Sequence, residues 1–381
     1  MKVLHIIAAY KPAYIYGGPT MSASMLCEQL SQSGVSVEVF ATTANGAAEL
    51  PVVTNTPVWV DGVTVTYFKR ITKDHTHFSP ALLKTLRKRV TEFDLVHIHT
   101  WWNLVSVLSC AIAQSKNVPV VLSPRGTLSD YSFLNKNSAK KGLIHGLMGK
   151  KLLQNSHIHV TSEREGLSLM ELVTPQSISI ISNFVKLGDS AIKKHQTSNF
   201  LRLIFFSRIE EKKGLDILLE ALKLLTIPFH LTIAGNGDKA YIDKLKALIT
   251  DPLMAGKITW AGFYGDDKFE LLNTHDVLVL PSHDENFGNV VIESLSVGTA
   301  VLVSANVGLA TYVDEHKLGW ICQTNPQSVS EQIKRIYTNQ VNDAKRIRNT
   351  APDIIRRDFT GDKLVQEYLR FYQNIIKVSR I

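Results

Sequence analysis

The chain has 381 residues, of which 45% are hydrophobic and 20% charged, and it carries a net charge of +8. A chain this apolar can offset the entropy of folding, so disorder, collagen and coiled coil are excluded, and the length fits about two to three domains. Cys27, Cys110 and Cys322 lie far apart without C-x-x-C spacing, which excludes a disulfide framework and a cysteine zinc site and fits a reducing cytosol.

The first half of the chain alternates short β-branched runs with longer amphipathic ones, which indicates parallel strands joined by helices. The N-terminal run has one lysine and no small-residue cleavage site, so we expect a first strand and not a signal peptide. No uncharged apolar run approaches the ~18 residues of a membrane span. A helix is expected over 20–33, and strands at Val3–Ala9, Ser36–Thr42, Val63–Phe68, Leu95–His99, Val118–Ser123, Ile158–Thr161 and about Ile178–Phe184.

Basic residues concentrate between Lys69 and Lys151, where fourteen Lys or Arg stand against four Asp or Glu. This asymmetry favours a polyanionic partner, with a solvated basic face as an equal alternative. Segments 82–90 and 136–153 mix basic and apolar residues at helical spacing, which is typical of a helix in a lipid headgroup layer and equally of a surface helix. Nucleic acid is disfavoured, because no RNP sequence, zinc finger or aromatic stripe accompanies the charge.

A polar, featureless stretch at 186–199 indicates a linker, and a second α/β series follows it. Helices are expected at 215–225 and 241–249, and an amphipathic helix over 362–378 should pack on an apolar surface. Strands are expected at 201–206, 230–235, 257–262, 276–281 and 299–304. The chain is therefore predicted to form two Rossmann-like domains.

Three strand-end segments carry the candidate chemistry, because open parallel sheets bind ligands beyond the carboxyl ends of their strands. Gly17 and Gly18 precede a helix, so the backbone there can approach an anion closely, although a plain turn has the same pattern. Arg208 and Lys213 lie five residues apart before a helix, which suits a diphosphate. Pairing of these two with Glu210 and Glu211 in a surface charge cluster is the alternative.

The most informative segment is PSHDENFGNVVIE at 281–293. Glu285 and Glu293 flank the start of a helix that opens near Gly288 or Asn289. Carboxylates accept hydrogen bonds from sugar hydroxyls, and the free N–H groups between them can hold phosphate oxygens. One segment could thus hold a nucleotide-sugar, whereas isolated glutamates would be read as partners of the helix dipole.

Taken together, GGP at 17–19, HIH at 97–99, SPRG at 123–126, SRIEEKKG at 207–214 and the E-x7-E pair at 285 and 293 resemble family 4 glycosyltransferases, retaining enzymes of the GT-B fold. The resemblance runs from the first strand to the last helix. It implies an α/β chain with two Rossmann-like domains facing across a cleft. The acceptor-binding domain would span 1–185 and the nucleotide-sugar domain 200–361, with the helix at about 362–381 packing back on the first.

The resemblance also implies roles for individual residues. Glu285 would bind donor-sugar hydroxyls and Glu293 the ribose, while Arg208 and Lys213 would neutralise the leaving diphosphate and His99 would lie beside sugar and acceptor. Glu285, His99, Arg208 and Lys213 are thus the expected catalytic residues. Further donor contacts would come from Gly17 and Gly18, from the backbone near Gly262 and Phe263 at the base, and from Asn286, Phe287, Gly288, Asn289 and Val290 around sugar and phosphates.

Arg125 departs from the family pattern, since many relatives have His in this loop. SPRGTL is similar to the branch associated with capsule, exopolysaccharide and O-antigen assembly. We expect Arg125 to bind the acceptor, facing an anionic acceptor or a donor phosphate. An ion pair with Asp130 or another carboxylate is the equal alternative.

The implied reaction moves a hexose or N-acetylhexosamine from a nucleotide diphosphate sugar, taken as UDP-linked, to a hydroxyl of a glycan or polyprenyl-diphosphate-linked acceptor, with retained configuration. Neither glutamate has a clear nucleophile role, so a front-face transfer is the hypothesis. No D-x-D motif ends a strand and Arg208 with Lys213 supplies the charge, so no metal and no other cofactor is expected. The H-x-H pairs at 75/77, 97/99 and 157/159 lack a third ligand nearby, which disfavours zinc.

Three other functions are compatible with parts of the sequence. The segment 235–240 matches a dinucleotide fingerprint, but the next strand ends without an acidic residue, which disfavours a dehydrogenase. A nucleotide-sugar epimerase or hydrolase remains open, as does a non-catalytic, membrane-surface module that binds nucleotide-sugar. The expected location is the bacterial cytoplasm, peripherally at the inner face of the membrane, on an anionic lipid surface.

Overall fold

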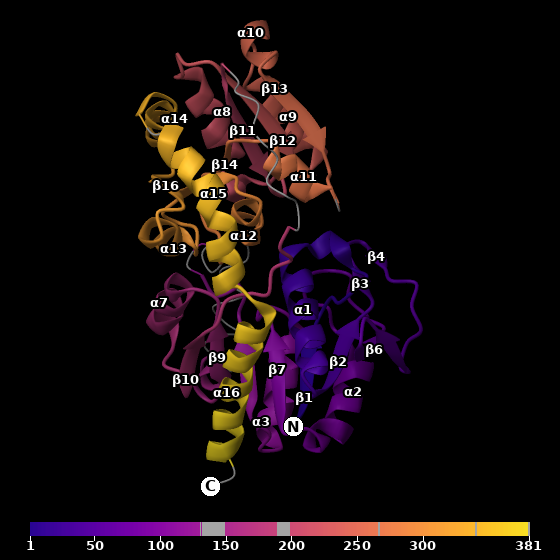
Figure 1. The fold of residues 1–381 in the computed structure, drawn as a ribbon. Coiled ribbons are helices and arrows are strands. Elements are labelled where there is room, and N and C mark those ends of the chain that lie inside the picture. The colour runs from indigo at the N-terminus through magenta and orange to yellow at the C-terminus, as the bar shows by residue number, and fades with distance from the viewer. Residues whose placement is uncertain (130, 132–148, 189–198, 266, 340, 380–381) are drawn as a thin grey trace. The chain divides into compact units, whose positions relative to one another are not determined.

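The computed structural model describes residues 1–129, 131, 149–188, 199–265, 267–339 and 341–379. It divides into two compact units, each described by itself. Unit 1 comprises Met1–Phe184 with Thr360–Ile381, and unit 2 comprises Val185–Phe359 (Figure 1). Both units are α/β, with helices packed on a mostly parallel sheet.

Unit 1 contains an eight-stranded sheet in the order β10-β9-β8-β7-β1-β2-β6-β5. Its strands are β1 Lys2–Ile7, β2 Ser36–Thr42, β5 Pro57–Val60, β6 Val63–Phe68, β7 Leu95–His99, β8 Val120–Ser123, β9 His157–Val160 and β10 Ser177–Ile180. Every pair is parallel except β5 with β6. The sequence did not predict β5. This edge strand begins at Pro57, a position where the sheet needs no N–H donor and proline is therefore tolerated. The two-residue strands β3 (Ala44–Asn45) and β4 (Ala48–Glu49) were also too short to predict.

The helices of unit 1 cover both faces of this sheet. They are α1 Gly18–Gln32, α2 Pro80–Arg89, α3 Leu104–Ser115, α6 Lys150–Gln154, α7 Glu163–Leu172 and α16 Gly361–Ser379, with short turns η1 Tyr14–Tyr16 and η2 Val90–Glu92. Successive strand residues point to opposite faces. Val3 and Ile7 of β1 share a core with apolar residues of α1 and α16, whereas Leu4 and Ile6 share one with α2 and α3.

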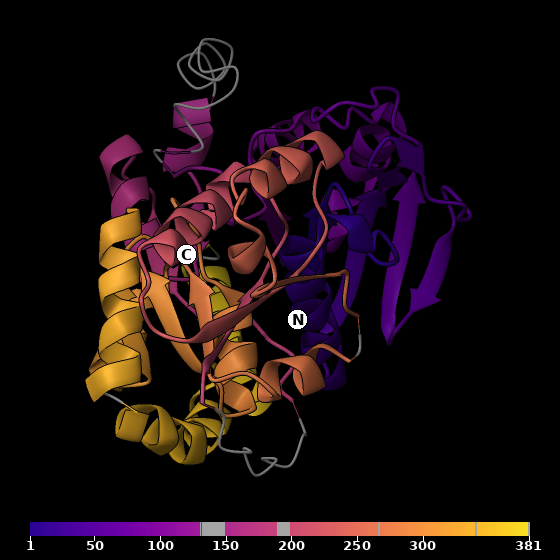
Figure 2. The same cartoon turned by 90° about the horizontal axis from the view of Figure 1, so that it is seen from above.

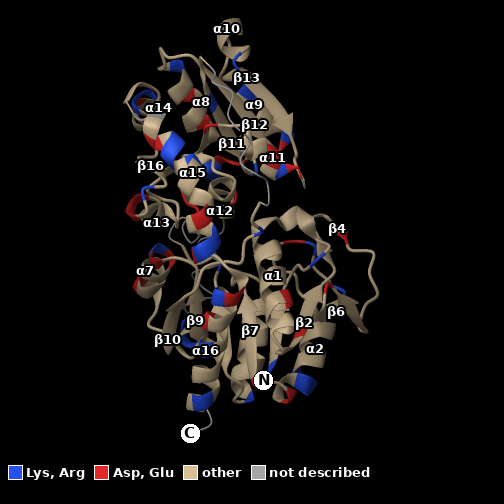
Figure 3. Cartoon of the chain, viewed as in Figure 1, with Lys and Arg blue, Asp and Glu red and all other residues tan. Residues whose placement is uncertain are grey.

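The helix α2 corrects one membrane hypothesis. Leu82 and Leu86 are fully buried in the core beneath it, so its apolar stripe faces the sheet and not a lipid layer. Its exposed face carries Lys84, Arg87 and Lys88. Figure 3 shows the basic residues of the chain in blue. The other candidate segment, 136–153, lies largely outside the described residues. Across the described parts of the chain, no helix combines the length and apolarity that a bilayer span requires.

Unit 2 is a second parallel sheet, in the order β13-β12-β11-β14-β15-β16. Its strands are β11 Leu201–Phe206, β12 Phe229–Ala234, β13 Ile258–Gly262, β14 Val277–Leu280, β15 Ala300–Ser304 and β16 Gly319–Cys322. Its helices are α8 Leu215–Lys223, α9 Lys239–Ala247, α10 Pro252–Ala255, α11 Lys268–Asn273, α12 Asn289–Ser296, α13 Ala310–Glu315, α14 Pro326–Asn339 and α15 Val341–Asp358, with the short turn η4 Glu211–Lys213. Figure 2 shows helices on both sides of these strands. The four-residue strand β16 was not predicted.

The boundary between the units differs from the expected linker. Val185 is part of the unit 2 core, the Gly188 N–H donates to Ser296 Oγ at 3.0 Å, and Arg356 Nη2 donates to the Gly188 carbonyl at 3.0 Å. The expected linker began at residue 186, but residues up to Gly188 belong to unit 2. The sequence did not indicate this, because the contacts that hold Gly188 come from residues far along the chain. Residues 189–198 lie outside the described part of the chain.

Candidate functional site

Two of the predicted segments meet at one edge of the unit 2 sheet. The strands β11 and β14 are parallel neighbours, so the loops that follow them begin side by side. An ion pair joins Lys213 Nζ of the first loop to the Glu285 carboxylate of the second. Lys212 Nζ pairs with Asp284 at 2.8 Å. The structure thus brings together two segments that the sequence could only list separately.

Glycine permits this close approach. Gly214 adopts a φ of +70°, and a Cβ there would lie 2.2 Å from the carbonyl oxygen of Pro281. Any other residue would push the loop at 211–214 away from the loop after β14. The backbone of His283 also donates to the Lys212 carbonyl at 2.9 Å, which fixes the two loops to each other.

The second loop places Glu285 next to the start of α12. The Glu285 N–H donates to the Asn306 carbonyl at 3.1 Å, and the Gly308 N–H donates to the Glu285 carbonyl at 2.8 Å. Gly288 then turns with a φ of +93°, and no side chain caps the helix that follows. Glu285 therefore lies on a backbone held from both sides, beside a helix N-terminus that favours negative charge.

The other predicted donor residues fall into three environments. Lys268 Nζ contacts Glu293 Oε1 at 2.7 Å; sequence reasoning missed this lysine, since nothing in KFELLN marks it as a partner. Arg208 is exposed and pairs with Glu210 at 3.1 Å. Phe287 is 2% exposed and packs edge to face on Phe359, so its side chain belongs to the core of unit 2.

In unit 2, the remaining predicted donor contacts lie at the end of β13 and at the start of α12. Gly262 ends β13 with a φ of +73°, and the next residue, Phe263, is 72% exposed. Asn286, Asn289 and Val290 are half-buried around the start of α12.

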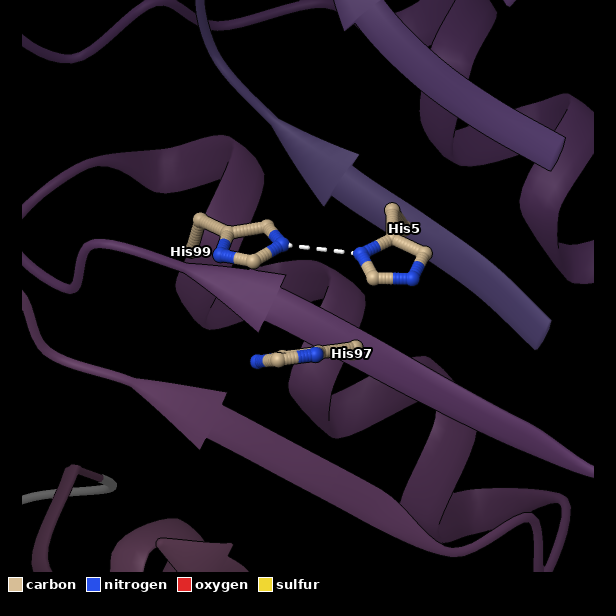
Figure 4. Close-up of side chains that lie close together, drawn as sticks. All are labelled: His5, His97 and His99. Carbon is tan, nitrogen blue, oxygen red and sulfur yellow. Dashed lines mark hydrogen bonds between the residues drawn. The ribbon is translucent and has the colours of Figure 1, made fainter. Parts of the chain in front are cut away.

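Unit 1 contains a buried layer of histidines on the sheet face that α16 covers. His5 comes from β1, His97 and His99 from β7, and His159 from β9, and none of them has exposed surface. The H-x-H spacing puts His97 and His99 on one face, and His5 lies opposite His97 in the strand register. Figure 4 shows His5, His97 and His99 with their rings close together.

One chain of hydrogen bonds in this layer has a single direction. His159 Nε2 lies 2.8 Å from the Ile181 carbonyl and must donate to it, so His159 Nδ1 accepts from Ser123 Oγ at 2.6 Å. Ser123 then accepts from His97 Nε2 at 2.6 Å, and His97 Nδ1 accepts the Tyr372 hydroxyl at 2.6 Å. The proton positions of three buried side chains are thus set by one backbone carbonyl.

A second chain starts at Arg125, on the loop after β8. Its Nε donates to His99 Nδ1 at 3.2 Å, which leaves the His99 proton on Nε2. His99 Nε2 then donates to His5 Nδ1 at 2.9 Å. Arg125 Nη1 donates to Ser22 Oγ at 2.7 Å and to Asn183 Oδ1 at 3.1 Å. Sequence reasoning missed Ser22, Asn183 and His5; only the strand-end place of Asn183 could have pointed to it.

Burial keeps these imidazoles neutral. It lowers the pKa of His5 and of His159 to about 3, and the Arg125 charge contributes in the same direction. The pKa values of His97 and His99 also lie well below the usual range, because of burial and then the neighbouring imidazoles and Arg125. His99 is fully buried, and its ring nitrogens contact Arg125 and His5.

The three histidines of Figure 4 would be a metal site by proximity alone, since their ligand atoms lie within 4.8 Å of one another. Their protonation does not fit a cation. His97 uses both nitrogens in hydrogen bonds, and His99 needs its Nδ1 lone pair for Arg125. The guanidinium adds a positive charge in the same layer. The donor set therefore disagrees with metal binding.

Two family profiles match the chain in sequence. Residues 16–189 match the family described as "Glycosyltransferase Family 4", and residues 188–353 match "Glycosyl transferases group 1". The two matches join within the segment where unit 1 gives way to unit 2.

Individual proteins agree with these matches. The chain is 24% identical over 98% of both chains to an uncharacterized glycosyltransferase, MJ1607, of Methanocaldococcus jannaschii. It is 33% identical over 35% of its length to the lipopolysaccharide core biosynthesis glycosyltransferase LpsE of Rhizobium meliloti, covering 39% of that protein. The structure of Alr3699/HepE from Anabaena in complex with UDP-glucose superposes with a TM-score of 0.74 at 18% identity, covering 98% of this chain and 100% of that one. This likeness confirms the expected fold of two Rossmann-like domains.

Proposed function

Because the chain carries a family 4 glycosyltransferase domain followed by a group 1 glycosyltransferase domain, we propose that it is a hexosyl- or N-acetylhexosaminyltransferase that uses a UDP-sugar. The UDP-glucose complex of the Anabaena neighbour supports this donor. Transfer goes to a hydroxyl of a glycan or lipid-linked glycan, with retained anomeric configuration. The lipopolysaccharide core enzyme of Rhizobium supports a role in cell-surface polysaccharide synthesis.

The observation that carries this proposal is the Lys213–Glu285 ion pair beside the start of α12. A cation, a carboxylate and uncapped helix N–H groups then lie within one corner of unit 2. Phosphate oxygens bind the cation and the N–H groups, and sugar hydroxyls donate to the carboxylate. The Glu293 carboxylate lies about one turn further along α12. In this proposal it accepts hydrogen bonds from the ribose hydroxyls.

Catalysis then rests on stabilising the departing diphosphate. Lys213 and Arg208 supply positive charge to the leaving oxygen, so the reaction needs no metal ion. Glu285 is already held by Lys213 and accepts from the sugar, a role different from that of an attacking nucleophile. The acceptor hydroxyl attacks on the face the diphosphate leaves, and a leaving phosphate oxygen takes its proton.

Nucleotide binding tests this proposal. We expect UDP to raise the melting temperature more than GDP, ADP or dTDP, since a ligand at 100 times its Kd adds about 2.7 kcal/mol of stability. Saturating EDTA should leave both the shift and sugar transfer unchanged. Equal or absent shifts with all four nucleotides would contradict the UDP-sugar donor. Release of free sugar or an epimer as the main product would favour a hydrolase or epimerase instead.

A further inference from the structure

Within the described part of the chain, Arg125 is a buried cation whose hydrogen-bond acceptors are all uncharged. The residue is 9% exposed, and its Nε and Nη1 donate to His99, Ser22 and Asn183. These three acceptors are an imidazole, a hydroxyl and an amide. Among the described residues, no carboxylate lies within ion-pair distance of this guanidinium. Asp130, the partner named for the alternative ion pair, lies outside the described residues.

The carboxylate whose charge acts on Arg125 is committed elsewhere. Glu165 accepts from the Gly126 N–H at 2.8 Å through Oε1 and from the Thr161 N–H at 2.9 Å through Oε2. Burial lowers the pKa of Arg125, and the distant charge of Glu165 only partly opposes this. A buried charge without a counter-ion is costly, and a ligand of opposite charge removes that cost.

One edge of the guanidinium remains available. Both N–H groups of Nη1 and the Nε–H are used, but Nη2 has no hydrogen-bond partner among the described residues. Nη2 is not fully enclosed by the protein, so part of its surface is open to solvent. The two N–H groups of Nη2 are therefore accessible to a ligand.

The backbone holds this arrangement in a rarely adopted conformation. Arg125 has a φ of +52°, in the left-handed region that a long side chain seldom adopts, and Glu165 ties the following residue in place. Such strain persists where the surrounding structure fixes it, and it concentrates at functional sites.

We propose that the Nη2 edge of Arg125 is a subsite for a phosphate group, and that His99 and His5 are positioning residues that aim it. The subsite deepens the proposed function and rests on it for the identity of the substrate that carries the phosphate. His99 contributes as a neutral acceptor that orients Nε without adding a charge. The chain from Arg125 through His99 to His5 keeps the guanidinium from rotating.

The test measures how inorganic phosphate stabilises the folded protein in a phosphate-free buffer. Each variant is compared with its own melting temperature without phosphate, so a loss of stability does not obscure the result. All variants are made in an Arg208→Gln, Lys213→Gln background, which removes the two cations of unit 2 that the proposed function gives to the diphosphate. Arg87→Gln is the matched control, because it deletes one exposed positive charge of unit 1.

We expect Arg125→Gln to weaken phosphate binding at least about tenfold, while Arg87→Gln leaves it unchanged. Arg125→Lys should fall between them, since an ammonium keeps the charge but loses the fork. His99→Phe should also weaken binding, and His99→Gln should restore part of it through an amide oxygen that accepts from Nε. An unchanged phosphate shift in Arg125→Gln, or no shift in the parent protein, overturns the subsite. Equal phosphate binding in both His99 variants overturns the positioning role.

Titration of the parent protein and of Arg125→Gln with UDP, both with Arg208 and Lys213 intact, separates the two sources of the phosphate. If Arg125→Gln weakens UDP and inorganic phosphate alike, the subsite holds the donor diphosphate. If UDP binding stays intact while phosphate binding is lost, the acceptor carries the anionic group. A phosphate shift that depends on Arg125 without any nucleotide shift would contradict the proposed function and leave the subsite standing.

Discussion

Lys213 and Glu285 lie 72 residues apart in the chain and form one ion pair, with side chains that are 11% and 19% exposed. Removing one partner leaves the other charge largely out of water, so the pair cannot be treated as a surface salt bridge. The same two groups are assigned to the diphosphate and to the sugar. Stability and activity are therefore coupled at this position.

We expect Glu285→Ala to lower the rate of sugar transfer by about 100-fold or more, since it removes a group that contacts the sugar in the transition state. UDP binding should change only a few-fold, because Lys213 and the α12 N-terminus remain. The unpaired Lys213 should lower the free energy of unfolding by about 2 kcal/mol. Steady-state kinetics and urea unfolding measure the two effects.

Glu211→Ala is the matched control for this change, because Glu211 is an exposed carboxylate in the neighbouring turn η4. It should leave both transfer and stability close to those of the parent protein. Full activity in Glu285→Ala would contradict the role given to this carboxylate.

The buried histidines predict a pH dependence of stability for the same physical reason that keeps them neutral. Their pKa values in the folded protein lie far below 6.5, near 3 for His5 and His159, so the unfolded chain binds more protons below about pH 6.5. The contribution of these neutral histidines to the free energy of unfolding is then fully present above pH 6.5, and it is lost as the pH falls toward 3. Each such histidine contributes a slope of up to about 1.4 kcal/mol per pH unit.

Urea unfolding between pH 7.5 and 4.5 measures this slope. His159→Gln should reduce it by about one histidine's share, whereas the exposed His75→Gln should leave it unchanged. The two variants are compared by their slopes, because His159→Gln also removes buried hydrogen bonds. A slope that is the same in both would show that His159 is not neutral in the folded protein.

At the scale of elements, α16 is bound to the unit 1 sheet by polar as well as apolar contacts. Its Leu364 and Phe371 lie in the apolar core beside α1. Two tyrosine hydroxyls of the same helix reach the histidine layer: Tyr372 contacts His97 Nδ1 at 2.6 Å and Tyr368 contacts His159 Nε2 at 3.0 Å. The bonds differ, because His159 Nε2 already donates to a backbone carbonyl.

This difference gives a matched pair of substitutions. Tyr372→Phe leaves a buried acceptor without a donor and should lower the free energy of unfolding by about 1–3 kcal/mol. Tyr368→Phe removes a hydroxyl from a nitrogen that keeps its carbonyl partner, so it should cost less. Urea unfolding of unit 1 compares the two, and a larger loss in Tyr368→Phe would contradict the direction assigned to the hydrogen-bond chain.

At the scale of the whole molecule, the excess of positive over negative charge lies on unit 1. The exposed face of α2 carries Lys84, Arg87 and Lys88, while the helix is anchored through buried leucines. A basic surface of this kind attracts anionic headgroups by long-range electrostatics without inserting apolar side chains. We therefore propose that any association with the membrane is peripheral and sensitive to salt.

Sedimentation with vesicles that contain phosphatidylserine tests this. The parent protein should be retained at 20 mM salt and released near 0.5 M, where charges are screened within about 4–5 Å. Replacing Lys84, Arg87 and Lys88 together by Gln should reduce retention. Replacing the exposed Lys244, Arg335 and Lys345 of unit 2 by Gln, which removes the same number of charges, should not. Equal loss in both variants would mean that net charge alone drives binding.

Much of the fold could be predicted because it follows local patterns. Alternation of β-branched runs with amphipathic segments indicated a parallel α/β fold, and most strands of the two large sheets fall where expected. The strands that were missed, β5 and β16, are short edge strands whose four residues give too brief a pattern. The extent of unit 2 was misplaced, because Gly188 joins it through hydrogen bonds to residues far along the chain.

The sequence by itself determined the residue types at the strand ends and hence the candidate chemistry of Lys213, Glu285 and Arg125. Only the tertiary structure decided which of them meet. Strand order brought the loops after β11 and β14 together, buried Phe287 in the core, and placed His99 beneath Arg125 instead of at a surface. The physical reason is that pairing depends on sheet order and side-chain direction, which arise from packing between segments distant in sequence.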